Sequence, residues 1–454
     1  MKVLLLSPPG RHQYVRDYYC SKIAKADYSY SPVDLLLLSG RFPQSVFIDA
    51  IQQHLNVEAC LNRIKQEAPQ AIISLVASVS WPEDRSFLAK VKADLPSVPI
   101  LATGDVLLED GQRLLQQEKW LDAIILDFTN ADAVKFLAGD FDHLEQMIFR
   151  TVDGRISTCI APRRPGPITD LPQPRHELFL NQHYAYPFVR HRRFATVQTD
   201  YGCPFPCRFC VMGSLSHRVR PKEEVIKELR DLRQRGIREI YFNDQTFGGT
   251  KRRLTDLCQA FLDSNLSLGW CCWNRVDLVA DQLELMKRAG CHTIMFGVDA
   301  GDEETLKLYR KGYTIDQVRR TFDRCRRLGI RTLGTFILGL PSQDGQAIKQ
   351  VIDLALELDP DFVSFNVYVP RKGTSVRAEL ADDLPDEETV LDQSGAMVKV
   401  SKCGISPEEL KTWRDQAVRS FYLRPGYVWR RLAGIRSFYD LEVLIRTAWS
   451  MIWG

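Results

Sequence analysis

Short apolar runs alternate with amphipathic stretches over the first 140 residues of the chain. Five runs have the length of buried strands, and the segments between them repeat apolar residues at helical spacing. This alternation predicts a parallel sheet with helices on both faces, in a flavodoxin-like order with ligands at the carboxyl ends of the strands. The predicted strands are 3–7, 45–49, 71–77, 100–103 and 123–128, and the clearest helices are 57–67 and 83–94.

The same alternation returns at residue 193 and continues to about residue 375. Six strand–helix units predict an open partial barrel of the TIM type, (β/α)6, with its active residues at the carboxyl ends of the strands. The predicted strands are 193–199, 238–243, 268–274, 292–298, 331–338 and 362–368. The predicted helices are 221–235, 251–265, 281–289, 302–328 (broken at Gly312) and 343–357.

Two further segments complete the predicted α/β organisation of domains 1–140 and 193–375. Residues 141–192 are rich in proline and arginine and are expected to form a linker, either a solvated strap or a contact for an anionic ligand. Residues 376–454 are expected to form a helical extension. Its stretch 419–436 has five arginines, interleaved aromatics and no acid. It is therefore interpreted either as a peripheral contact with a membrane or lipid-like substrate, or as a cap on the barrel.

Composition narrows the class of protein. The chain has 454 residues, of which 45% are hydrophobic and 26% charged, which is typical of a globular protein with more than one domain. A net charge of +3 argues against a general nucleic-acid binder. Twelve cysteines in so long a chain do not suggest a disulfide scaffold, and no signal peptide or membrane-length apolar run is evident. We therefore expect a cytoplasmic protein, with membrane association left open through the C-terminal stretch.

Three cysteines, Cys203, Cys207 and Cys210, have the spacing C-x3-C-x2-C on a segment bent by two prolines. One compact loop of this kind aims three thiolates at a common point. Soft thiolate ligands favour an iron–sulfur cluster or zinc. A zinc site needs a fourth ligand, and the nearest candidate, His217, is at no known finger spacing. A cluster held by three thiolates keeps one iron open for chemistry, so a catalytic cluster is favoured over a zinc-binding interaction protein.

The cysteine motif resembles that of radical S-adenosylmethionine (radical SAM) enzymes, in which C-x3-C-x-aromatic-C binds a 4Fe-4S cluster. The resemblance implies that Cys203, Cys207 and Cys210 bind the cluster, with Phe209 as the aromatic residue before the last cysteine. It also implies that the open iron takes S-adenosylmethionine, which is cleaved reductively to a 5′-deoxyadenosyl radical. The protein then supplies placement and exclusion of water.

The resemblance also implies cofactor contacts at the ends of the later strands. Asn243 and Asp244 are expected near the methionine amine, although an Asn-Asp turn is the alternative for Asp244. Asp299 is expected at the ribose hydroxyls, the alternative being a helix N-cap, for which Asp302 is better placed. The remaining candidates are Arg275 near the sulfonium or substrate, Ile337 and Gly339 at the adenine, and Tyr368 after the sixth strand.

The N-terminal half resembles the cobalamin-binding domain that often precedes a radical SAM barrel. The opening K-V-L-L-L-S-P-P-G and the segment F-I-D-A fit that pattern. The motif D-x-H-x-x-G, whose histidine binds cobalt, is missing, and His12 is expected to be a solvated loop residue. Two interpretations stay open for this half: cobalamin binding, or a domain that only covers the barrel.

The resemblance therefore implies a radical SAM enzyme that abstracts hydrogen from an organic substrate, such as the lipid-like or tetrapyrrole molecules on which members of the family act. The basic and aromatic C-terminus favours a hydrophobic or anionic substrate. A cobalamin-dependent radical methyltransferase is the alternative within the same family. The resemblance implies a one-electron donor such as flavodoxin or ferredoxin, and no nucleic-acid partner is expected.

Overall fold

The computed structural model describes residues 1–26, 28–380, 392–435 and 437–453. The chain divides into two compact units. The first consists of Met1–Ala24 and Ser29–Ala185, and the second of Lys25–Tyr28 and Tyr186–Gly454. Within the described residues, no helix has the length and apolar character that crossing a bilayer requires.

The first unit is built on one mixed sheet with the order β4-β1-β5-β6-β7-β8-β9. The five strands from β4 to β7 are parallel, and β8 and β9 are added antiparallel. The parallel part has the flavodoxin-like order 2-1-3-4-5, as the sequence predicts. The strands are β1 Val3–Ser7, β4 Val46–Asp49, β5 Ala71–Leu75, β6 Ile100–Thr103, β7 Ala123–Ile125, β8 Gln146–Arg150 and β9 Ile156–Ile160.

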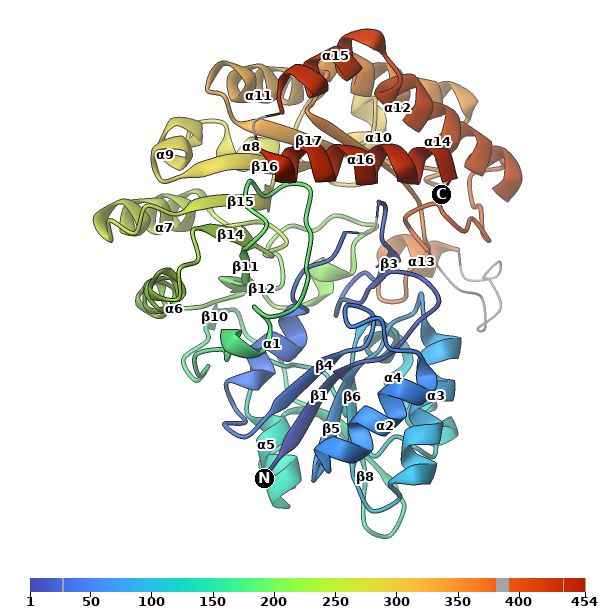
Figure 1. Cartoon of the computed structure of the whole chain (residues 1–454). Helices are drawn as coiled ribbons and strands as arrows, with labels where there is room; N and C mark the ends of the chain where they lie inside the picture. The colour runs from blue at the N-terminus through green and yellow to red at the C-terminus, as the bar shows by residue number, and fades with distance from the viewer. Residues whose placement is uncertain (27, 381–391, 436, 454) are drawn as a thin grey trace. The chain divides into compact units, whose positions relative to one another are not determined.

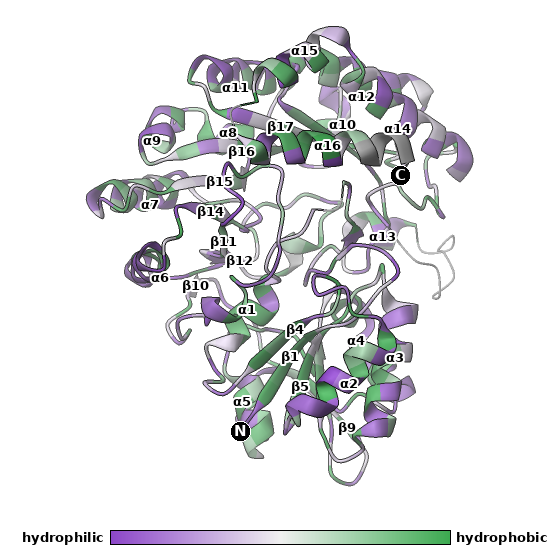
Figure 2. Cartoon of the chain, in the orientation of Figure 1, coloured by the Kyte–Doolittle hydropathy of each residue, from purple (hydrophilic) through white to green (hydrophobic). Residues whose placement is uncertain are grey.

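Helices cover both faces of this sheet (Figure 1). Figure 1 shows α2, α3 and α4 on one side and α1 and α5 on the other. All residues of β1 and β5 are buried, as expected for parallel strands packed on two faces, and these strands are among the most apolar in Figure 2. The helices are α1 Val33–Ser39, α2 Val57–Glu67, α3 Trp81–Asp94, α4 Asp105–Gln117 and α5 Asp132–Ala138.

The segment 141–192, expected to be a linker, begins with two regular strands. Strands β8 and β9 belong to the sheet of the first unit, and Met147 and Ile148 on β8 lie in its core. The prolines that suggested a linker start only at Pro162, after β9 has ended. The structure differs from the expectation here because an antiparallel hairpin has no helix between its strands, and so breaks the alternation that the prediction followed.

The second unit contains the expected open parallel sheet, with the order β11-β14-β15-β16-β17-β18. Its helices α6 to α12 follow the strands in alternation (Figure 1). The strands are β11 Ala195–Val197, β14 Glu239–Phe242, β15 Gly269–Asn274, β16 Cys291–Asp299, β17 Arg331–Leu338 and β18 Phe362–Val367. The helices are α6 Lys222–Gln234, α7 Lys251–Asp263, α8 Val276–Val279, α9 Leu283–Arg288, α10 Glu303–Leu308, α11 Ile315–Arg327 and α12 Gly345–Leu358.

The C-terminal extension is helical, as predicted, and part of it packs on the barrel. Helix α14 lies against β18, where the Tyr422 hydroxyl donates a hydrogen bond to the Val363 carbonyl oxygen at 2.7 Å. Tyr439 on α16 donates to the carbonyl oxygen of Tyr186 at 2.8 Å. The extension therefore covers an edge strand of the barrel sheet. Its helices are α13 Ser375–Glu379, α14 Pro407–Tyr422, α15 Pro425–Ala433 and α16 Phe438–Trp453.

Candidate active site

The cysteine motif lies on a loop at the carboxyl end of the first barrel strand. The loop starts after the short strand β12, Asp200–Tyr201, which pairs with β13, Arg218–Val219. Gly202 begins it with a φ of 77°, and a Cβ there would lie 2.6 Å from the carbonyl oxygen of Ser216. Only glycine fits this left-handed position beside another backbone segment. The hairpin and Gly202 together turn the chain so that the cysteines follow at the mouth of the barrel.

The three cysteines are of intermediate exposure, and they are not joined in disulfides. The Cys203 sulfur lies 3.6 Å from the hydroxyl of Thr246, which follows β14. Arg275, which follows β15, points its Nη1 group at the Cys207 sulfur over 3.7 Å. Burial, and secondarily the negative charge of Cys207, raise the pKa of Cys203, whereas nearby hydrogen-bond donors and Arg275 lower it. The sulfurs of Cys203 and Cys207 therefore face the carboxyl ends of β14 and β15.

Among the described residues, no three His, Cys, Asp or Glu side chains are gathered so that they could hold a single metal ion. This finding concerns sites for one ion, and the expectation that the three thiolates share one cluster stays a prediction. In a 4Fe-4S cluster each cysteine binds a different iron, so its ligand sulfurs need not converge as the ligands of one zinc ion must. The donor set fits the cluster in kind, because three soft ligands come from one partly exposed loop and a cation faces one of them.

Asp244 anchors the start of the cysteine loop. Its carboxylate accepts hydrogen bonds from the Thr199 amide at 2.6 Å, the Thr199 hydroxyl at 2.8 Å and the Asp200 amide at 2.9 Å. Asp244 is fully buried, and this burial, with the neighbouring Asp200 charge, raises its pKa to about 7. A contact between Asp244 and a bound amine remains a prediction, since both oxygens already accept bonds from the chain.

Asn243 precedes Asp244 in the chain, and unlike Asp244 it has a buried polar group without a hydrogen-bond partner. Its side-chain oxygen accepts a hydrogen bond from the Tyr241 hydroxyl at 2.6 Å, while its buried Nδ2 group has no hydrogen-bond partner. A buried amide donor without a partner costs free energy, so it suits a position that meets an acceptor on a ligand.

Asp299 ends β16 and forms a buried ion pair with Lys311. It has a φ of 70°, and the register between β16 and β17 shifts at this point. Asp302, and not Asp299, caps helix α10 by accepting a bond from the Thr305 amide, so the N-cap interpretation of Asp299 is wrong. Burial alone would lower the pKa of Lys311, but the Asp299 carboxylate raises it well above its usual value. Lys311 was missed in the sequence because it lies twelve residues away, beyond a helix.

An apolar cluster gathers the predicted Phe209, Ile337 and Tyr368. Phe209 and Ile337 pack against a core formed by Tyr309, Leu340, Tyr368 and Val376. The Tyr368 side chain is buried, and its hydroxyl has no hydrogen-bond partner. This cluster connects the cysteine loop with the ends of β17 and β18.

Gly339 follows β17 with a φ of 81°. A Cβ at this position would lie 2.6 Å from the Leu410 side chain of α14. The Gly339 amide donates to the Gln343 side-chain oxygen at 2.8 Å, and the Gln343 amide group donates to the Ile337 carbonyl oxygen at 3.3 Å. The backbone edge expected to meet the adenine is thus bridged by Gln343, which the sequence analysis did not single out.

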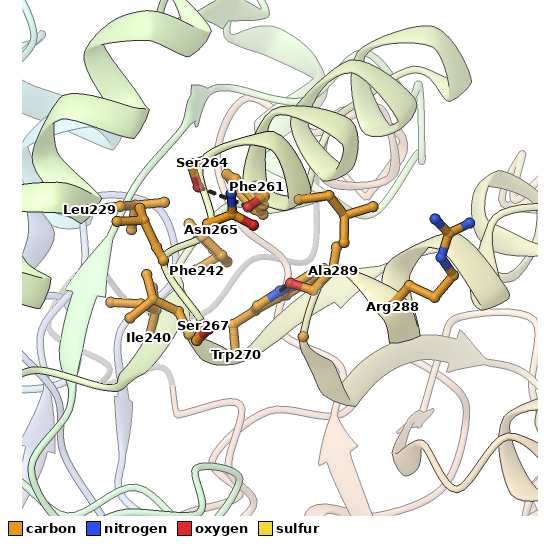
Figure 3. A pocket seen from close by; sticks show the side chains of 14 residues that line it. Leu229, Ile240, Phe242, Phe261, Ser264, Asn265, Ser267, Trp270, Arg288 and Ala289 are labelled. Carbon is orange, nitrogen blue, oxygen red and sulfur yellow. Dashed lines mark hydrogen bonds between the residues drawn. The ribbon is translucent and has the colours of Figure 1, made fainter.

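The cavity in Figure 3 lies at the other end of the sheet. It has a volume of about 170 Å³ and is lined by residues that precede β15 and β16, such as Ser267 and Gly290, and by Trp270 at the start of β15. None of the cysteines or predicted cofactor contacts lines it. The candidate active site is therefore the carboxyl end of the barrel and not this cavity.

Residues 197–355 match the radical SAM superfamily. The match runs from the end of β11 into α12, and so includes the cysteine loop and the carboxyl ends of β14 to β17. The chain therefore carries a radical SAM domain. This match removes the support for the zinc-binding alternative.

Curated relatives match the chain at low identity. An uncharacterized methyltransferase, PH0819, of Pyrococcus horikoshii is 30% identical over 270 residues, which are 57% of this chain and 57% of the relative. The anaerobic magnesium-protoporphyrin IX monomethyl ester cyclase of Rubrivivax gelatinosus is 23% identical over 76% of this chain and 64% of its own. The chain thus spans about three fifths of the length of these relatives.

Two solved structures resemble the fold over most of the chain. The cobalamin-dependent radical enzyme OxsB, with aqua-cobalamin and S-adenosylmethionine bound, gives a TM-score of 0.70 at 16% identity, covering 99% of this chain and 72% of OxsB. The radical methyltransferase TsrM of Kitasatospora setae, with cobalamin and a 4Fe-4S cluster bound, gives 0.63 at 17% identity, covering 84% and 74%. At these identities the likeness concerns the fold, and it confirms the predicted α/β class.

Proposed function

We propose that this protein is a radical SAM enzyme that cleaves S-adenosylmethionine reductively and abstracts a hydrogen atom from an organic substrate. The observation that carries the proposal is the radical SAM match over the loop of Cys203, Cys207 and Cys210 at the carboxyl end of β11. The electron would come from a small donor such as a flavodoxin or a ferredoxin.

The three cysteines would hold a 4Fe-4S cluster as thiolates. When bound, the cluster supplies one electron that breaks the bond between sulfur and the 5′ carbon, which gives methionine and a 5′-deoxyadenosyl radical that takes hydrogen from the substrate. Asp299 would accept hydrogen bonds from the ribose hydroxyls, and its ion pair with Lys311 holds this carboxylate in place. The buried Nδ2 group of Asn243 would donate to the methionine part.

The apolar cluster around Phe209, Ile337 and Tyr368 would receive the adenine and exclude water from the radical. Apolar side chains keep water out of the site, and a dry site limits side reactions of a reactive intermediate. The unpartnered hydroxyl of Tyr368 would donate to a ring nitrogen.

Anaerobic reconstitution tests the proposal. The wild-type protein should bind about four iron and four sulfide and release 5′-deoxyadenosine when reduced with S-adenosylmethionine. Cys207→Ala should lose both properties. Cys159→Ala, which removes a partly exposed thiol on β9, is the matched control and should keep both. Retained 5′-deoxyadenosine production in Cys207→Ala would contradict the assignment of the cluster ligands.

A cobalamin-dependent methyltransferase is a second candidate, favoured by the flavodoxin-like order of the first unit and by its likeness to the fold of TsrM. Ligands of such sheets lie at the carboxyl ends of the strands. His12, beyond the end of β1, is exposed and packs edge-on against the Tyr14 ring. The structure therefore agrees with the prediction that His12 is a solvated loop residue. Bound cobalamin after reconstitution, with transfer of a labelled methyl group from S-adenosylmethionine, would support this candidate. A preparation that is active without cobalamin would exclude the cobalamin-dependent methyltransferase, and hydrogen abstraction would then be the remaining candidate.

The C-terminal helices suggest a hydrophobic substrate environment. On α16, Phe438, Leu441 and Ile445 share one helical face and are exposed, and Phe438 is 92% exposed. Trp429 on α15 is 74% exposed. Trp429 lies in the stretch 419–436, which carries arginines and no acid, so this part of the surface suits an anionic membrane, from which a lipid-like or tetrapyrrole substrate would be taken.

Vesicle sedimentation tests the membrane contact. The full chain should sediment with vesicles that contain phosphatidylglycerol and much less with pure phosphatidylcholine. Trp429→Ser and Phe438→Ser together should abolish sedimentation. Phe141→Ser, which changes an exposed aromatic residue in the first unit, should not. Equal sedimentation of all variants would argue against the contact.

A further inference from the structure

Arg275 is a buried cation beside the cysteine loop. It follows β15 and is 7% exposed. Its Nη1 group is directed at the Cys207 sulfur over 3.7 Å, within the range of an N–H···S hydrogen bond. The centre of its guanidinium group stacks 3.8 Å from the centre of the Phe205 ring, which lies between Cys203 and Cys207 in the chain. The loop and this arginine are therefore in contact at two points.

The other nitrogens of Arg275 are fixed by neighbours. Nε and Nη2 bind the two oxygens of Asp277 at 3.0 and 2.9 Å in a bidentate pair. Nη2 also donates to the carbonyl oxygen of Lys311. A planar guanidinium held along one edge and stacked on one face has little freedom, so Nη1 remains directed at Cys207.

We propose that Arg275 is a positioning residue that raises the reduction potential of a cluster bound at Cys207. A hydrogen bond to a ligand sulfur and a fixed positive charge both stabilise the reduced cluster, which carries one more negative charge than the oxidised cluster. An arginine stays charged at any working pH, so its effect is constant. The inference rests on the proposed function, because it requires the cluster at the loop, and it adds the residue that makes that cluster reducible by a weak biological donor.

The experiment is an anaerobic redox titration of the reconstituted full chain, followed by the electron paramagnetic resonance signal of the reduced cluster. Arg275→Met keeps the length of the side chain but removes the charge and the donors. It should shift the reduction equilibrium toward the oxidised cluster by about tenfold, which is about 59 mV for one electron. Arg275→Gln, which keeps a neutral N–H donor, should shift it in the same direction by less.

Arg208→Met is the matched control. Arg208 lies on the same loop, but its guanidinium binds the Leu308 carbonyl oxygen and Glu379 instead of a sulfur. Its removal should leave the potential nearly unchanged, so a larger shift for Arg275→Met separates the contact with sulfur from the general loss of a positive charge.

The outcomes are distinguishable. A wild-type protein that binds no cluster overturns the proposed function and this inference with it. A wild-type cluster whose potential is unchanged in Arg275→Met and Arg275→Gln overturns the inference alone. Loss of the cluster from both variants, with an unchanged circular-dichroism spectrum, would assign Arg275 to cluster assembly and would also overturn the role in potential.

Discussion

Lys311 pairs with Asp299 inside the barrel, with both side chains almost fully buried. The pair joins the end of β16 to the segment between α10 and α11. Tyr313, two residues beyond Lys311, donates its hydroxyl to the Gly297 carbonyl oxygen of the same strand end. These contacts fix the strand end at which the ribose contact is expected. Because both side chains are buried, removing one of them would leave the charge of the other uncompensated.

Lys311→Met should therefore destabilise the protein strongly. Removing one partner of a buried pair leaves the other charge uncompensated, which typically lowers the free energy of unfolding by about 3–5 kcal/mol. Urea unfolding of the protein without cofactors measures this loss. The double variant Asp299→Asn with Lys311→Met should recover part of it, because it removes both charges. Additive losses in the double variant would show that the two side chains do not interact.

Asp244 makes stability depend on pH in a predictable direction. Burial raises its pKa to about 7 in the folded protein, above the usual 3.8 of an unfolded aspartate. The folded state therefore binds a proton that the unfolded state releases between these values, so this contribution to stability is complete at low pH and lost as the pH rises through about 7. Between pH 5 and pH 7 the loss should be about 2 kcal/mol.

The difference between wild type and Asp244→Asn isolates this effect from other titrating groups. The asparagine keeps the size of the side chain but does not titrate, so the variant should lose less stability than wild type between pH 5 and pH 7 in urea unfolding. Asp263→Asn, at the exposed end of α7, serves as the control and should behave as wild type. Parallel curves for Asp244→Asn and wild type would contradict the assignment.

The barrel was predictable from the sequence because its apolar strands alternate with helices along most of the chain from residue 193 to residue 375. The expected strand 331–338 coincides with β17, and the expected break at Gly312 separates α10 from α11. Gly312 has a φ of 75°, which a helix does not adopt. Strand and helix periodicity and glycine at a left-handed turn depend on neighbouring residues only, so they can be predicted from one sequence.

The contacts within the site were less predictable because they join residues far apart in the chain. The sequence placed Arg275 near the cofactor but gave no indication of its contact with Cys207, 68 residues earlier. It likewise named Asp299 but not Lys311, and it assigned Asp244 to a ligand although its oxygens bind the backbone of Thr199 and Asp200. Such pairs depend on how strand ends meet, which apolar periodicity does not specify.

Gly202 should be required for the shape of the cysteine loop. Gly202→Ala would place a Cβ 2.6 Å from the Ser216 carbonyl oxygen at a φ of 77°. The expected cost is about 1–3 kcal/mol of local strain, with reduced iron incorporation on reconstitution. Gly426→Ala, on α15 with no atom within 4 Å, is the control and should leave the iron content unchanged. Normal iron content in Gly202→Ala would show that the loop tolerates another geometry.

Tyr368→Phe should have opposite effects on the protein with and without its ligand. The Tyr368 hydroxyl is buried and has no hydrogen-bond partner, so its removal should leave the free energy of unfolding of the cofactor-free protein unchanged or raise it by about 1 kcal/mol. If this hydroxyl meets the adenine, the same change should weaken binding of S-adenosylmethionine to the reconstituted protein about tenfold, since the ring nitrogen then loses its donor. Urea unfolding and equilibrium dialysis measure the two effects separately.

Tyr422→Phe provides the contrast, because its hydroxyl forms hydrogen bonds with both backbone groups of Val363 on β18. Loss of this hydroxyl should lower the free energy of unfolding without changing the affinity for S-adenosylmethionine. Unchanged affinity in Tyr368→Phe would exclude its hydroxyl from the adenine site.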